Sequence, residues 1–183
     1  MNLDLKGQVV IVTGASRGLG EAIVKDLVDE GALVVAAARS EDALKELALY
    51  SPDQIAVKVA DMENSNEVEE IVDFAIGEFG SLDAVVNNAG IAPAGKFVET
   101  GIEIMEKTIA VNVLAPAILA KKAAKYFIEN NLRGSIVNIA STSGIKGKAL
   151  LVGYSASKGA MMRMTEALAA EWARFGIRVN TIA

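Results

Sequence analysis

The sequence feature that most constrains the fold is a glycine-rich turn between a short apolar stretch and a helical pattern. The turn spans Thr13–Gly20 and has glycines at positions 14, 18 and 20. Before it, Val9–Val12 are all β-branched, as in a buried strand. After it, apolar residues recur at helical spacing, namely Ala22, Ile23, Leu27 and Val28. The pattern predicts a strand that bends sharply into a helix.

A turn of this kind is suited to binding a phosphate group. Glycines let the backbone approach an anion closely, and the amino terminus of a helix offers free N–H groups and a partial positive charge. A plain tight turn would also use glycines, and the spacing differs from the commoner GxGxxG. The flanking strand and helix favour a diphosphate site, with candidate residues Gly14, Ser16, Arg17, Gly18, Leu19 and Gly20.

Apolar, strand-like runs alternate with helical patterns along the rest of the chain. Further strands are expected at 33–38, 55–60, 84–86, 135–140 and 178–183, and the longest helices at about 102–130 and 154–175. Strands this continuously apolar are buried on both faces, which predicts an α/β fold with a doubly wound parallel sheet in three layers. We expect about six strands in a single domain, 1–183. Ligands of such sheets bind at the carboxyl ends of the strands.

The composition excludes several kinds of chemistry. The chain has no cysteine and no histidine, which removes disulfides, thiol nucleophiles, Ser-His-Asp triads and the usual zinc sites, so no metal is expected. The net charge is −5 with scattered basic residues, which argues against nucleic acid as a partner. No run has the length and apolarity of a membrane span, and the start does not resemble a secretory signal. These features predict a cytoplasmic enzyme or binding domain whose proton chemistry would come from Tyr, Lys, Asp or Glu.

The residues after the second strand bear on cofactor choice. Ala38 and Arg39 occupy the place where a dinucleotide fold meets the adenosine ribose. Alanine lacks the carboxylate that would accept from the ribose hydroxyls of NAD, whereas Arg39 offers a planar donor to a 2′-phosphate. Arg17 could approach from the other side. Either arginine alone is typical of an ordinary solvated surface, but together they favour NADP(H).

Two further strand ends carry candidate binding residues. Asp61 follows the third strand and could accept from an adenine amino group. It could equally begin a helix whose first turn contains Glu63, Asn64 and Glu67. The fourth strand is followed by Asn88, Ala89 and Gly90. Small residues at this place would let a ligand ring lie on the backbone, although a simple turn also uses Asn and Gly.

Four polar residues are candidates for catalysis. Pro116 lies inside a predicted helix and cannot donate to the carbonyl of Asn112, which predicts a local bend and a free acceptor there, as in any proline kink. Tyr154 and Lys158 are four residues apart and share a helix face. An ammonium near a phenol lowers its pKa. Ser141 ends the fifth strand at the same edge of the sheet. Singly these residues are unremarkable, but their coincidence favours an active site.

These motifs together resemble the short-chain dehydrogenase/reductase family. The match consists of TGASRGLG, NNAG, Asn112, Ser141 and the segment Tyr154–Lys158, in order along essentially the whole chain. The resemblance implies a Rossmann-type fold and hydride transfer between a nicotinamide cofactor and a carbonyl or alcohol. Ser141 would polarise the carbonyl, Tyr154 would donate the proton, and Asn112 would support a proton relay through water. Lys158 would bind the ribose and lower the Tyr154 pKa.

The resemblance also carries expectations about the rest of such an enzyme. Gly144 and Gly147 resemble the 3-oxoacyl-carrier-protein reductase and sugar-alcohol dehydrogenase branches, while Leu150–Val152 are more apolar than in either. Members continue past the sixth strand into a substrate-binding segment and a seventh strand, which predicts that this sequence is truncated before them. The alternative function is a dinucleotide-binding module that does not turn over. The resemblance further implies a homodimer or homotetramer through the two long helices.

Overall fold

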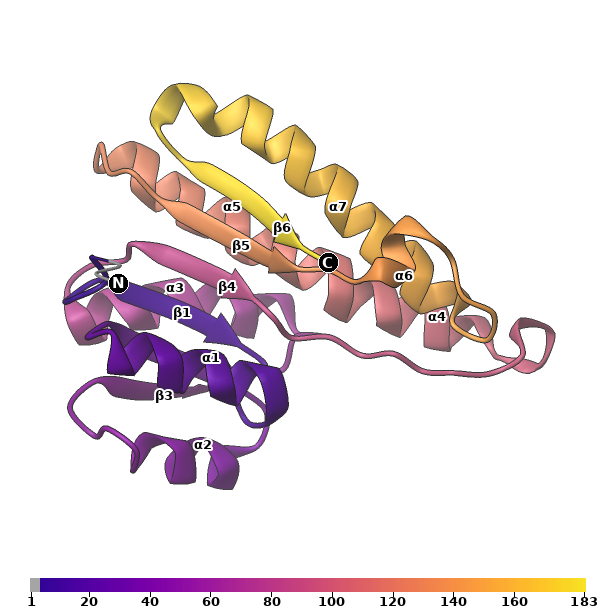
Figure 1. Cartoon of the computed structure of the whole chain (residues 1–183), viewed down its shortest axis with the longest axis horizontal. Coiled ribbons are helices and arrows are strands. Elements are labelled where there is room, and N and C mark those ends of the chain that lie inside the picture. Colours follow the sequence, from indigo (N-terminus) through magenta and orange to yellow (C-terminus); the bar gives the residue numbers. More distant parts are fainter. Residues whose placement is uncertain (1–3) are drawn as a thin grey trace.

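A parallel sheet of six strands forms the centre of the computed structural model, which describes residues 4–183 (Figure 1). The strand order is β3-β2-β1-β4-β5-β6. The strands are β1 (Val9–Thr13), β2 (Leu33–Ala38), β3 (Ile55–Val59), β4 (Ala84–Asn87), β5 (Ser135–Ile139) and β6 (Arg178–Ile182). Every residue of β1 is buried, as its unbroken β-branched run predicts. The order reverses between β1 and β4, which places a ligand site at their carboxyl ends.

Helices cover the two faces of the sheet and complete three layers, as predicted. Helices α1 (Gly18–Asp29) and α2 (Glu41–Ala48) lie in front of the sheet in Figure 1 and pack on Val10 and Val12. The opposite face, with Val9 and Ile11, packs against helices α3 (Ser65–Phe79), α5 (Ala115–Glu129) and α7 (Val152–Trp172). Alternate residues of one strand therefore belong to two separate hydrophobic clusters.

The cluster with Val10 and Val12 does not extend over β5 and β6. In β5, Ile136 and Asn138 face the cluster with Val9 and Ile11 and are buried, whereas Val137 and Ile139 on the other face are half-buried. Ile182 of β6 is 59% exposed. Within residues 4–183, the helices on the α1 side thus cover the β3–β1 half of the sheet and leave the β5–β6 half open (Figure 1).

The predicted helix at 102–130 is three segments of one continuous rod. Helix α4 (Ile102–Ile109) passes into a π-helical turn (Ala110–Leu114) and then into α5. Pro116 has no N–H to donate to Asn112, and the wider turn just before it accommodates the missing bond. A π-helical turn that contains Asn112 thus lies where the sequence predicts an irregularity, while the bend and the free Asn112 carbonyl stay predictions.

Two short helical segments lack any periodic signal in the sequence. The 3₁₀ turn Phe97–Glu99 follows β4, and helix α6 (Thr142–Ile145) follows β5. The helix predicted at 154–175 begins at Val152 and ends in a 3₁₀ turn at Ala173–Phe175. The loops around 97–99 and 145–151 form the tapered end of the molecule that extends beyond the sheet in Figure 1. None of the helices described for residues 4–183 is long and apolar enough to cross a membrane.

Candidate active site

The glycine turn is packed directly against the segment that follows β4. Gly14 has φ +66°, and a Cβ there would lie 2.8 Å from Ala89 Cα. A Cβ on Gly20 would collide with the Gly14 carbonyl and with the Asn88 side chain. Both positions exclude larger residues because the two loops approach so closely. Gly18 also has positive φ, +59°, but faces open space.

Thr13 and Asn88 fasten these two loops together. Thr13 Oγ1 accepts from the backbone N–H groups of Asn88 and Ala89, at 3.1 and 3.0 Å. The Asn88 amide donates in return to the carbonyls of Thr13 and Gly14, at 2.9 and 3.2 Å. Asn88 thus shapes the site from behind the glycine turn. Sequence reasoning missed Thr13, whose role depends on a partner 75 residues away.

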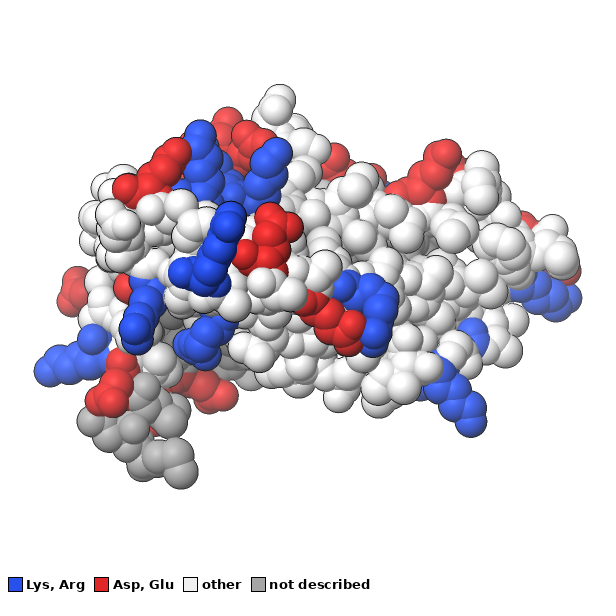
Figure 2. Space-filling view, turned by 90° about the horizontal axis from the view of Figure 1, so that it is seen from above, with Lys and Arg blue, Asp and Glu red and all other residues white. Residues whose placement is uncertain are grey.

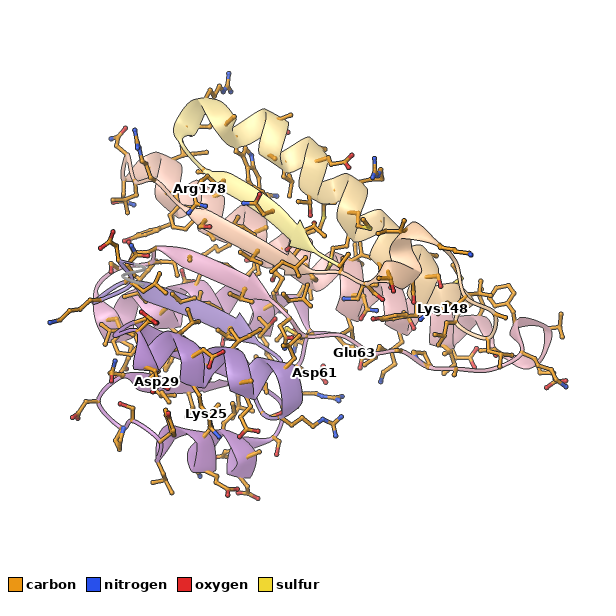
Figure 3. All side chains as sticks on the ribbon, in the orientation of Figure 1. Lys25, Asp29, Asp61, Glu63, Lys148 and Arg178 are labelled. Carbon is orange, nitrogen blue, oxygen red and sulfur yellow. The ribbon has the colours of Figure 1, made fainter. Side chains whose placement is uncertain are left out.

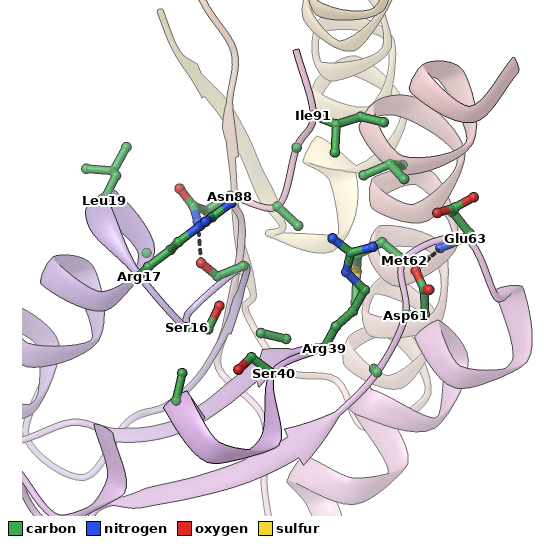
Figure 4. A pocket seen from close by; sticks show the side chains of 18 residues that line it. Ser16, Arg17, Leu19, Arg39, Ser40, Asp61, Met62, Glu63, Asn88 and Ile91 are labelled. Carbon is green, nitrogen blue, oxygen red and sulfur yellow. Dashed lines mark hydrogen bonds between the residues drawn. The ribbon is translucent and has the colours of Figure 1, made fainter. Parts of the chain in front are cut away.

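A cavity of about 500 Å³ opens at the carboxyl ends of β1, β2 and β4 (Figure 4). Most of the predicted binding residues line it: Gly14, Ser16, Arg17, Leu19, Gly20, Arg39, Asp61, Asn88, Ala89 and Gly90. Gly18 does not. The walls also include Ser40, Met62, Glu63, Ile91 and Val111, which sequence reasoning did not find. Figure 3 places Asp61 and Glu63 at this edge of the sheet and Arg178 at the opposite one.

Two features of the cavity suit it to an anion. Arg17 is the N-cap of α1 and makes no side-chain cap bond, so the first N–H groups of this helix keep their capacity to donate to an anion. Arg17 approaches from the glycine turn and Arg39 from the end of β2 (Figure 4). Neither guanidinium forms an ion pair with another residue among 4–183.

Asp61 combines features of both interpretations that the sequence left open. Its Oδ1 accepts from Glu63 N at 3.0 Å, and its own N–H donates to Glu67 Oε2 at 2.7 Å. The N-cap of α3 is nevertheless Asn64, whose side chain accepts from Asn66 N. Asp61 therefore shapes the approach to the helix while lining the cavity.

Lys158 is the most deeply buried charged side chain near the cavity. The residue is 3% exposed, and its Nζ donates to the Ile139 carbonyl at 2.6 Å and lies 5.8 Å from the centre of the Tyr154 ring. Burial lowers the pKa of Lys158 to about 8, because the interior disfavours the charged form. A Cβ on Gly90 would lie 3.5 Å from this nitrogen, so Lys158 adjoins the wall of the cavity.

Asn112 joins the loop after β4 to α7 through its side chain. Its Oδ1 accepts from Ile91 N at 2.9 Å, and its Nδ2 donates to Ile91 O at 2.9 Å and to Ser157 Oγ at 3.0 Å. Ser157 Oγ donates onward to the Tyr154 carbonyl at 2.7 Å. Sequence reasoning singled out the Asn112 carbonyl and missed Ser157. The only signal for Ser157 was its place on the helix face between Tyr154 and Lys158.

Ser141 is held beside the same helix by close backbone packing. It is the N-cap of α6, and its Oγ accepts from Ser143 N at 3.1 Å. The hydroxyl proton is not used in this bond and can be donated to another acceptor. A Cβ on Gly144 would lie 2.7 Å from the Lys158 carbonyl carbon, so only glycine lets α6 rest on α7. Ser141, Tyr154, Lys158 and Asn112 thus belong to one connected end of the fold.

A family profile described as short chain dehydrogenase matches residues 8–183. The chain belongs to the short-chain dehydrogenase family, which consists of oxidoreductases. Two relatives are each 37% identical to this short-chain dehydrogenase chain. 3beta-hydroxysteroid dehydrogenase 2 of Eggerthella lenta aligns with 99% of the chain and 71% of its own length. L-fucose dehydrogenase of Mus musculus aligns with 96% and 64%.

Solved structures agree with this assignment. A short-chain dehydrogenase from Streptomyces avermitilis has a TM-score of 0.91 at 34% identity, covering 96% of this chain and 64% of its own. A short-chain type dehydrogenase/reductase from Mycobacterium marinum has a TM-score of 0.93 at 31% identity, covering 100% and 77%. The chain therefore spans about two thirds to three quarters of the length of these proteins, and the predicted family and Rossmann-type fold are confirmed.

Proposed function

We propose that this short-chain dehydrogenase is an NADP(H)-dependent oxidoreductase that interconverts a carbonyl and an alcohol. The observation that carries the proposal is the position of Gly90. A Cβ on Gly90 would lie 3.3 Å from Asn112 Oδ1 and 3.5 Å from Lys158 Nζ. The wall of the cavity therefore adjoins the side chains of Asn112 and Lys158. A dinucleotide in the cavity would end beside Tyr154 and Ser141.

The residues of the cavity fit such a cofactor. The glycine turn and the uncapped start of α1 would bind its diphosphate, and Asp61 and Val111 would flank its adenine. Arg17 and Arg39 would hold a 2′-phosphate in the absence of a carboxylate at Ala38, which supports NADP(H) over NAD. When bound, the cofactor supplies the hydride, and the chain orients and polarises the reacting groups.

Proton transfer is assigned to Tyr154, with three residues in support. Ser141 would donate its free hydroxyl proton to the substrate oxygen, because its Oγ already accepts from Ser143 N. The ammonium of Lys158, 5.8 Å from the Tyr154 ring centre, would stabilise the negative charge that develops as the phenol loses its proton. Asn112 fixes the first turns of α7 through Ser157.

The substrate and the assembly also belong to this proposal. The substrate is a small molecule with a carbonyl or hydroxyl group, and the location is the cytoplasm, as expected from composition. A groove of about 530 Å³ is lined by residues of α5 and α7, both apolar (Ala117, Ala124, Ile128, Met164, Leu168 and Trp172) and charged (Lys121, Lys125, Glu129 and Glu171). The apolar part of this groove supports pairing of two copies through the long helices, in a homodimer or homotetramer.

The test combines cofactor titration with one matched pair of variants. Fluorescence titration should show tighter binding of NADPH than of NADH, and a panel of ketones, aldehydes and sugars should reveal NADPH oxidation. Tyr154→Phe should abolish that oxidation while leaving NADPH affinity unchanged, whereas Tyr126→Phe on α5 should behave like the parent protein. NADPH binding without turnover of any carbonyl would favour the non-catalytic binding module instead. Full activity of Tyr154→Phe would show that the proton comes from another group.

A further inference from the structure

Outside the residues assigned above, the described chain contains one buried polar network that the proposed function does not use. Asn87, Asn138 and Thr181 lie on three neighbouring strands in a single cross-strand row, since Asn87 pairs with Asn138 and Asn138 with Thr181. Thr165 of α7 lies over this row. The exposed fraction is 1% for Asn87, 0% for Asn138 and 4% for Thr165. We call these four residues the polar row.

Hydrogen bonds connect the polar row without a break. Asn87 Nδ2 donates to Asn138 Oδ1 at 2.8 Å, and Asn138 Nδ2 donates to Thr165 Oγ1 at 2.8 Å. Thr181 Oγ1 donates to Thr165 Oγ1 at 2.7 Å. Thr165 sends its own proton to the Met161 carbonyl at 2.9 Å, so its hydroxyl has reached its full capacity of one donated and two accepted bonds.

This network is well placed to set how α7 lies on the sheet. Five residues of α7 are buried, and three of these are polar: Ser157, Lys158 and Thr165. Each bonds to a residue outside α7: Ser157 to Asn112 of the π-helical turn, Lys158 to the Ile139 carbonyl and Thr165 to Asn138, the last two on β5. Apolar packing tolerates small shifts of a helix, whereas a buried amide that loses its partner is costly. Directional bonds therefore fix the register of this helix.

The polar row and Lys158 are neighbours on both α7 and β5. On α7, Thr165 follows Lys158 by seven residues, about two turns, and so lies on the same face. On β5, their partners Asn138 and Ile139 are adjacent. A rotation or shift of α7 that breaks the Thr165–Asn138 bond would also displace Lys158 from the Ile139 carbonyl.

We propose that Asn138 and Thr165 are positioning residues for the Tyr154–Lys158 pair, acting through the register of α7 on β5. The proposal rests on the function assigned to Tyr154 and Lys158. Its physical content, that the polar row determines where Lys158 Nζ sits, is independent of turnover. It can therefore be tested without a cofactor or a substrate.

The experiment follows the titration of Lys158 by NMR in protein labelled with ¹³C at lysine Cε. The Lys158 signal is identified by its loss in Lys158→Met, and its midpoint in the parent protein is expected near pH 8. Thr165→Val keeps the shape of the side chain but removes the hydroxyl. Without it, α7 shifts and Lys158 becomes more hydrated, so the midpoint should rise by about one pH unit. Thr165→Ser restores the hydroxyl and should restore the parent midpoint.

Thr108→Val is the matched control. Thr108 is also a fully buried helical threonine whose Oγ1 donates four residues back, to Ile104 O at 2.7 Å, and it lies beside Gly153 of α7. Its loss should lower the unfolding free energy without moving the Lys158 midpoint, which separates positioning from mere stability.

A folded Thr165→Val protein with the parent midpoint would overturn the proposal, as would an equal shift in Thr108→Val. If Thr165→Val does not fold, the triple variant Asn87→Leu/Asn138→Leu/Thr165→Val replaces the three buried members of the polar row by apolar groups, so that no buried amide loses its partner. Such a change is often nearly neutral, and only the half-buried Thr181 remains of the row. The same titration is then read on the triple variant, with the same two outcomes. Failure of the proposed function would show itself separately, as carbonyl reduction that survives Tyr154→Phe.

Discussion

At the scale of single residues, the proposed preference for NADP(H) depends chiefly on one guanidinium. Arg39 projects into the cavity from the end of β2, next to an alanine where a carboxylate would favour NAD (Figure 4). Arg17 faces the same space from the glycine turn. Because both arginines lack an ion-pair partner among residues 4–183, a phosphate would not compete with an internal carboxylate for either of them.

Replacing Arg39 by aspartate should reverse this preference. In Arg39→Asp, the new carboxylate repels a 2′-phosphate and accepts from ribose hydroxyls, so the ratio of NADH to NADPH affinity should rise at least tenfold, about 1.4 kcal/mol. Titration of both cofactors against both proteins measures the ratio. Arg174→Asp, at the far end of α7 and outside the cavity, should leave it unchanged. Equal affinity for the two cofactors in the parent protein would contradict the assignment.

The roles of single residues could be predicted where the interacting residues are close in the sequence, but not where they are brought together only by the tertiary fold. Lys158 and Tyr154 share a helix face by spacing alone, so their association was readable from the sequence. Ser157 bonds to a residue 45 positions away, and Asn138 to residues 51 and 27 positions away. Such partners are set by how a helix rests on a sheet, and no local pattern specifies that geometry.

At the scale of elements, Gly20 in α1 and Gly77 in α3 show that a helical glycine can be required at one position and replaceable at another. Gly20 lies where the first turn of α1 meets the Gly14 carbonyl and the Asn88 amide, with no room for a Cβ. Gly77 lies on the exposed side of α3, and nothing lies within 4 Å of the place where a Cβ would be. The same substitution should therefore have opposite effects.

Gly20→Ala should destabilise the protein by about 1–3 kcal/mol, because the β1–β4 loops must separate to admit a methyl group. Gly77→Ala should stabilise it by about 0.5–1 kcal/mol through helix propensity. Urea unfolding of the two variants in parallel measures both free energies. Only Gly20→Ala should also weaken NADPH binding. A neutral Gly20→Ala variant would show that the two loops are less tightly packed than the structure indicates.

Strand positions were the most predictable elements. β2 was expected and observed at Leu33–Ala38. A short, uninterrupted apolar run in a chain that alternates strands and helices predicts a buried strand. The rod from Ile102 to Glu129 was predicted as one bent helix. Its periodicity indicates a helix, and Pro116 indicates an irregularity, but the choice of a π-helical turn is made by packing around Val111 and Asn112, both buried.

At the scale of the whole molecule, Figure 2 shows how charge is distributed on one face. Acidic and basic side chains are interspersed at one end of this face, while the other end, near the loops after β4 and β5, carries fewer charges. Most ion pairs join exposed residues, such as Lys45 with Glu41 and Arg163 with Glu166. Pairs of this kind contribute little to stability, so the pH dependence of folding should reflect the buried Lys158 instead.

Folding stability should rise with pH between about 8 and 10.5. Lys158 has a pKa of about 8 in the folded protein and 10.5 when unfolded. Below pH 8 both states are protonated and burial of the charge costs the full penalty. Between the two values the unfolded state binds the extra proton, so the free energy of unfolding increases, by about 3 kcal/mol in total. Above 10.5 no further change comes from this group.

Urea unfolding from pH 7.5 to 10.5 on the parent protein and Lys158→Met isolates this effect. Other groups in the range, such as Tyr50, whose pKa is raised by its hydrogen bond to Asp29, are common to both proteins and cancel in the difference. As the pH rises, the unfolding free energy of the parent protein should increase by about 3 kcal/mol relative to that of Lys158→Met. A constant difference would mean that Lys158 is already hydrated in the folded state.

The bond between Thr13 and Asn88 also sets the stage of protein synthesis at which the cavity can form. The ribosome adds about 5–20 residues per second, so the glycine turn is synthesised roughly 4–15 s before the segment on which it rests, 75 residues later. During that interval β1 can pair only with β2, and the glycine turn lacks the segment Asn88–Ala89 against which it packs. The cavity proposed for the dinucleotide is therefore complete only after β4 and the segment that follows it have been translated.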